Sequence, residues 1–263
     1  MKGWTPGMCA AFALMAVSAG AAPDDLEKES RDEPLKVGSQ FQLRAHPQSE
    51  NLDASLQATV EEDGYRIDVA GTYRIGDPAK YYHLDINLKS RMYKATKKAI
   101  PSEWAAQQGK RLDTHAAASA IAPGTWYVEL KLITEDPPQI DLATTVNYLR
   151  WSVSSTGAIT ILEGRRGCTA YDGTGQPYPV DTHWYTSTCA SSFVGSYPST
   201  HRVDASYYNW DWGYDSQSTT ASHVLTAQPN NNGTGNYNYS YSHAGEDSYL
   251  LQADYYVNGT QQF

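Results

Sequence analysis

The feature that most constrains this fold is the alternation of aromatic with small polar residues in two stretches late in the chain. The first aromatic row is Tyr208, Trp210, Trp212 and Tyr214, and the second aromatic row is Tyr237, Tyr239 and Tyr241. Successive side chains of a β-strand point to opposite faces, so residues two apart share a face about 6.6–6.8 Å from each other. Each row therefore predicts a strand with one aromatic face and one small polar face.

Shorter runs in the first half of the chain alternate in the same way, at 65–69, 81–88, 126–132 and 144–153. Turn signals such as Asp63-Gly64 and Pro123-Gly124 separate them, and only 102–108 has the pattern of a short helix. Many strands with frequent turns predict an all-β fold with antiparallel β-sandwich architecture. We expect either two β-rich domains or one large two-sheet sandwich. The Asn232-Gly233 pair predicts a tight turn, and the Asn258-Gly259 pair predicts the turn of a C-terminal hairpin.

The N-terminus has the pattern of a secretory signal peptide at residues 1–22. Lys2 precedes an apolar run at 8–17 and small residues at 18–22. That run is shorter than the roughly 20 residues that span a bilayer, and no later segment is more apolar. Residues 23–36 are charged and bracketed by prolines, which predicts a flexible lead-in. We therefore expect a secreted, periplasmic or extracellular protein with no transmembrane segment after signal removal.

Two cysteines, Cys168 and Cys189, remain once the signal is removed. In an exported chain they predict one disulfide, and a loop of about 22 residues would stabilise the fold by roughly 3 kcal/mol. No cysteine or histidine pair has the spacing of a zinc site. Asn209, Asp211 and Asp215 lack the pattern of a helical calcium loop. We expect neither a metal nor a cofactor.

Composition changes near Gly164, which predicts a β-sandwich domain at 37–163 and a Tyr/Ser/Asn-rich β domain at 164–263. The second segment has no lysine and holds 13 of the 20 tyrosines. The mature chain carries a net charge of −10, which argues against nucleic acid as a partner. A net charge of +6 lies within residues 80–111, where a solvated loop is the expected role and contact with an anionic surface the alternative.

No nucleophile elbow, zinc-protease motif, phosphate loop or dinucleotide fingerprint is present. A non-enzymatic, secreted binding protein is the best expectation, with the two aromatic rows as ligand-binding residues for a glycan or cell-surface polymer. The alternative role for both rows is the core, since aromatic residues bury large areas. A glycosidase-like hydrolase is a second candidate, with carboxylates drawn from Glu163, Asp172, Asp211, Asp215 and Glu246. A third is a structural or assembly subunit that pairs through edge strands.

Overall fold

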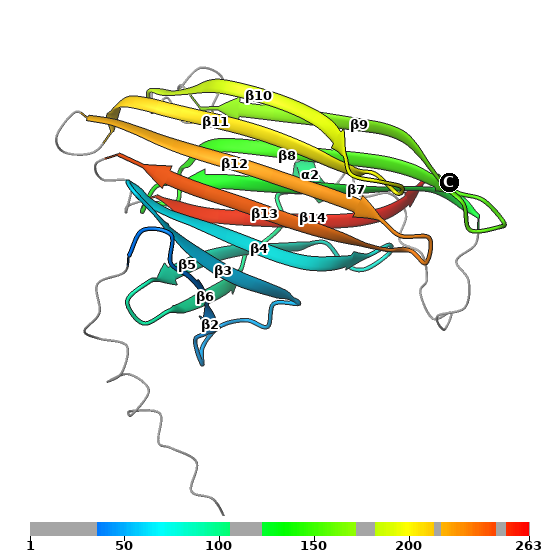
Figure 1. Cartoon of the computed structure of the whole chain (residues 1–263), viewed down its shortest axis with the longest axis horizontal. Coiled ribbons are helices and arrows are strands. Elements are labelled where there is room, and N and C mark those ends of the chain that lie inside the picture. Colours follow the sequence, from blue (N-terminus) through cyan, green and yellow to red (C-terminus); the bar gives the residue numbers. More distant parts are fainter. Residues whose placement is uncertain (1–35, 106–122, 172–181, 213–216, 246–250, 263) are drawn as a thin grey trace, which may run out of the picture. The chain divides into compact units, whose positions relative to one another are not determined.

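A computed structural model describes residues 36–105, 123–171, 182–212, 217–245 and 251–262, and it is an all-β sandwich. Residues Pro34–Phe263 form one compact unit. Two seven-stranded sheets make up this unit, and Figure 1 shows one sheet stacked on the other. The predicted signal peptide and nearly all of the charged lead-in fall outside the described residues.

Sheet A combines three strands of the first half with the antiparallel meander of β10 to β13 in the second half. Its order is β1 (Gln40–Gln42), β3 (Ala54–Glu61), β4 (Gly64–Arg74), β13 (Thr234–Ala244), β12 (Gln217–Pro229), β11 (Thr200–Trp212) and β10 (Trp184–Val194). All neighbours in this sheet are antiparallel. The predicted turn at Asn232-Gly233 joins β12 to β13, and Gly233 has a φ of 73° that favours glycine.

Sheet B is built around the last strand of the chain. Its order is β2 (Arg44–Ala45), β6 (Met92–Lys97), β5 (Lys80–Asn87), β14 (Gln252–Gln262), β7 (Gly124–Glu135), β8 (Asp141–Val153) and β9 (Ile159–Ala170). Only the short β2–β6 pair is parallel among the described strands. The predicted C-terminal hairpin is wrong, because β14 runs unbroken through Asn258-Gly259 and pairs with β7 along its whole length.

The helix prediction is confirmed for one turn. The helix α2 covers Ser102–Ala105, and the remainder of the predicted segment lies outside the described residues. No helix within the described ranges has the length and apolar character needed to cross a membrane.

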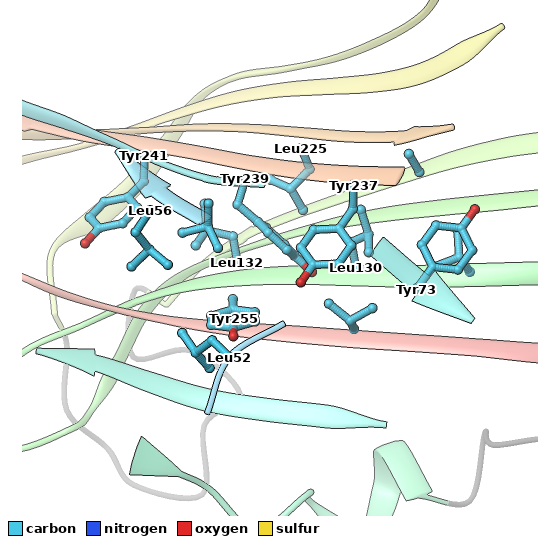
Figure 2. Close-up of a cluster of buried hydrophobic side chains, with 14 of the residues drawn as sticks. Leu52, Leu56, Tyr73, Leu130, Leu132, Leu225, Tyr237, Tyr239, Tyr241 and Tyr255 are labelled. Atoms are coloured by element: carbon cyan, nitrogen blue, oxygen red, sulfur yellow. The ribbon is translucent and has the colours of Figure 1, made fainter. Parts of the chain in front are cut away.

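The main core lies between the two sheets and mixes leucines with tyrosines and tryptophans. Trp126, Trp151 and Tyr239 are fully buried there, together with Leu130 and Leu225. Figure 2 shows tyrosines of sheet A pointing toward leucines and Tyr255 of sheet B. The Tyr239 hydroxyl donates to the backbone carbonyl of Tyr256 in the opposite sheet, so a polar tip is satisfied inside an apolar layer.

The composition change near Gly164 does not coincide with a division of the fold. Gly164 lies within β9, and each sheet contains strands from both segments. The predicted disulfide is confirmed: Cys168 of β9 is bonded to Cys189 of β10. These strands are edge strands of different sheets, so the bond ties the two layers together along one side of the sandwich.

Candidate functional site

The second aromatic row belongs to the core. Tyr237, Tyr239 and Tyr241 all point inward from β13 and are at most 5% exposed. Their rings lie in the layer between the sheets, with Tyr237 and Tyr239 edge to face at 5.4 Å (Figure 2). The second row therefore belongs to the core, which was the alternative role predicted for it, and none of its rings faces a ligand on the outer surface.

In the first aromatic row, Tyr208 and Trp210 point the other way. Tyr208 is 40% exposed and Trp210 is 54% exposed. Tyr207, which precedes them, and Asn209, which lies between them, are buried. The side chains of Trp212 and Tyr214 lie outside the described residues. Upstream on the same strand, Val203, Ala205 and Tyr207 are buried and show which face of β11 points inward.

Four exposed or half-exposed rings form what we call the aromatic patch: His183, Tyr185, Tyr208 and Trp210. Tyr185 and Tyr208 lie directly opposite each other on β10 and β11, with ring centroids 5.5 Å apart and planes 32° from parallel. The ring of His183 stacks on that of Trp210 at 5.6 Å and 21°. The patch thus presents two adjacent ring pairs at the outer face of sheet A.

Asn209 fixes the geometry of the patch from the buried face of β11. Its buried side-chain amide donates to the backbone carbonyl of Thr182 over 2.6 Å, and its oxygen accepts the backbone N–H of Asp211 over 2.7 Å. His183 follows directly and adopts a left-handed φ of 55°. The bonds of Asn209 therefore tie the segment that carries His183 to the strand that carries Trp210.

A line of hydroxyl groups begins beside the patch and crosses sheet A. Thr188, Ser206, Ser222 and Ser242 are consecutive register partners on β10, β11, β12 and β13. All four lie on the outward-facing side, with strand spacings of about 4.8 Å. The Thr188 and Ser206 hydroxyls are 2.7 Å apart and hydrogen-bonded. The outer face next to the rings is therefore hydroxyl-rich and free of lysine.

A second, unexpected feature is a buried charge cluster on the outer face of sheet B. It comprises His83 of β5, Lys98, Glu135 of β7, Asp141 of β8 and Asp254 of β14. His83 Nδ1 donates to Asp254 over 2.7 Å, and the Lys98 ammonium lies 2.7 Å from Glu135 and 2.6 Å from Asp254. Glu135 and Asp254 are at most 1% exposed, so the two cations are required to compensate them.

The surroundings shift the pKa values of this cluster strongly. Hydrogen bonds to Asp254 and then Glu135 raise the pKa of His83 to about 10. Burial raises the pKa of Asp141 to about 7, with repulsion from Glu135 acting in the same direction. Burial alone would raise the pKa of Glu135, but bonds from His83 and Lys98 outweigh it and the pKa is lowered.

Sequence spacing did not reveal this cluster, because its members come from four strands and the connection after β6. Lys98 was expected to belong to a solvated stretch, and that expectation is wrong for this residue. His83, Glu135 and Asp254 bring possible metal-ligand atoms within 4.8 Å of one another. Lys98 and the protonated His83, however, already pair with both carboxylates, so the arrangement is a closed ion-pair network rather than an open metal site.

The carboxylates suggested for a hydrolase do not form such a group in the described part of the chain. Glu163 pairs with Arg150 and Arg165 on the surface of sheet B. Asp211 lies on β11, while Asp172, Asp215 and Glu246 fall outside the described residues. Comparison of the chain with protein-family models, curated proteins and solved structures found no match.

Proposed function

We propose that this is an exported, non-enzymatic binding protein whose ligand is a carbohydrate held at the aromatic patch. The observation that carries the proposal is the outward orientation of Tyr185, Tyr208 and Trp210 in a sheet whose other aromatic row is buried. Large rings left at a surface, when the same sheet buries comparable rings, indicate a binding role. The disulfide is compatible with an oxidising, extracytoplasmic location.

The chemistry of the surface favours a sugar over other ligands. Sugar rings carry apolar C–H faces that stack on aromatic rings, and Tyr and Trp offer flat area at low conformational cost. The adjoining hydroxyls of Thr188, Ser206 and Ser222 can exchange hydrogen bonds with sugar hydroxyls. An extended glycan lying across the strands would contact the rings first and the hydroxyl line next.

Trp210→Ala and Tyr208→Ala test the proposal in a glycan array and in pull-down with insoluble polysaccharides. Each change should weaken binding about 5- to 150-fold if ring stacking contributes about 1–3 kcal/mol, as it does for nucleic-acid bases. Thermal stability should change much less than for a core tyrosine, because about half of each side chain is already exposed.

Tyr148→Ala is the matched control. Tyr148 stacks on Tyr127 at 5.4 Å on the outer face of sheet B, away from the patch. Wild-type binding that persists unchanged in Trp210→Ala would refute the patch as the site. A wild-type protein that binds no glycan or polysaccharide, or that releases new reducing ends from one, would refute the function itself.

A further inference from the structure

A cavity of about 460 Å³ opens between the two sheets, in a part of the molecule that the aromatic patch does not occupy. It is bounded by the β5–β6 hairpin, the start of β14 and the facing ends of β4 and β13. Its volume is within the range of about 300–1,000 Å³ that small-molecule sites occupy. Space of this size admits a ligand as large as a mono- or disaccharide.

Three tyrosines line the cavity: Tyr65 of β4, Tyr93 of β6 and Tyr241 of β13. Tyr93 and Tyr241 are 7% and 3% exposed, so their rings are nearly immersed in the core. Figure 2 shows the Tyr241 hydroxyl pointing away from Tyr237 and Tyr239, its neighbours in the second aromatic row.

No hydrogen bond joins these three phenol hydroxyls to another residue that the structure describes, and their oxygens are not among the fully buried side-chain atoms that lack a partner. Elsewhere in the core, Tyr73 and Tyr207 donate to backbone carbonyls. The hydroxyls that line the cavity can instead form hydrogen bonds with water or with a ligand. The cavity therefore contains hydrogen-bonding capacity that the protein itself does not use.

Gln252 adds a fourth unused group. It lines the cavity, and its side-chain oxygen is buried without a donor among the described residues. Neutral polar groups of the lining come from Gln48, Asn87 and Ser90, and apolar ones from Leu84 and Ile86. Asp85 and Lys94 also line the cavity and contribute one charge of each sign, so the lining has no excess charge from these two residues. A pyranose ring has apolar C–H faces and polar hydroxyl groups. The flat rings, apolar side chains and neutral donors and acceptors of the lining complement both.

We infer that this cavity is a second carbohydrate subsite, which takes the neutral end unit of a glycan. The inference rests on the proposed carbohydrate function but concerns different residues. The register line through Tyr65 crosses β13 and β12 to Tyr207, whose neighbour Tyr208 belongs to the patch. Tyr65 and Tyr207 are thus three strand spacings, about 15 Å, apart. Cavity and patch therefore lie toward the same end of sheet A, on its inner and outer faces respectively.

Isothermal titration with soluble disaccharides tests the subsite, using maltose, cellobiose, lactose and N,N′-diacetylchitobiose as probes. Wild-type protein should bind at least one of them. Tyr241→Phe keeps the ring and removes one hydroxyl, so it should weaken binding about three- to tenfold, the value of a neutral hydrogen bond. Ser90→Trp, on the β5–β6 turn, should fill the mouth of the cavity and abolish binding while leaving the core intact.

Tyr255→Phe is the control, because it removes a phenol hydroxyl from the same core without lining the cavity; its disaccharide affinity should equal that of wild type. Disaccharide binding that survives Ser90→Trp, or that Trp210→Ala alone removes, would overturn the subsite. If polysaccharides bind and no disaccharide does, the subsite fails while the proposed function stands. If neither binds, both fail.

Discussion

Asp141→Asn should stabilise the protein at neutral and alkaline pH and have little effect in mild acid. Asp141 lies directly opposite Glu135 where β7 pairs with β8, and like charges in that position destabilise a sheet. Burial and that repulsion raise the pKa of Asp141 to about 7. The asparagine keeps a hydrogen-bond donor next to Glu135 but carries no charge at any pH.

The sign and size follow from proton linkage. The Asp141 pKa is about 7 when folded and about 3.9 when unfolded, so the folded state holds the extra proton between these values. Stability is therefore lost as pH rises through this window, by at most about 4 kcal/mol at 1.4 kcal/mol per pH unit. Because solvent screens part of the interaction, we expect Asp141→Asn to gain about 2–4 kcal/mol at pH 8.

Urea denaturation of wild type and variant at each pH from 4 to 9 measures this difference. The stabilisation should be near zero at pH 4, grow between pH 4 and 7 and then level off. Asp63→Asn, in the exposed turn between β3 and β4, is the control and should stay within about 0.5 kcal/mol of wild type throughout. A gain that is independent of pH, or a loss at pH 8, would refute the charge-cluster argument.

Two further changes probe the disulfide and the core. Replacing Cys168 and Cys189 by serine should lower the free energy of unfolding by about 2–4 kcal/mol in urea denaturation, and an unchanged midpoint would show that the bond does not restrain the unfolded chain. Tyr239→Ala should cost about 3–5 kcal/mol in thermal unfolding, whereas Trp210→Ala should cost about 1 kcal/mol or less. Equal losses would contradict the opposite orientations of the two aromatic rows.

Several elements could be predicted because their causes are local. The alternation of side chains is a property of the extended backbone, so the strands at Tyr65 and Trp126 were recognisable from their own residues. Turn chemistry at Asn232-Gly233 is equally local. The disulfide followed from elimination, since only Cys168 and Cys189 remain after the expected signal cleavage.

The cavity and the charge cluster could not be predicted, because each assembles residues far apart in the chain. His83 and Asp254 are separated by 171 positions yet share a hydrogen bond, since β14 inserts between β5 and β7. Pairing with β7 explains why Asn258-Gly259 does not turn, because that ladder continues through both residues to Gln262. The periodicity of the sequence does not indicate which strands pair with each other in a sheet.

The sequence by itself determined that both aromatic rows are strands with an aromatic face; the tertiary structure alone decided which face is covered. Period-two alternation makes two faces but does not say which one meets the other sheet. On β13 the aromatic face carries Tyr239 into the core, while on β11 the opposite face, with Tyr207, is packed inward. Trp210 is therefore exposed because the second sheet covers the other side of its strand.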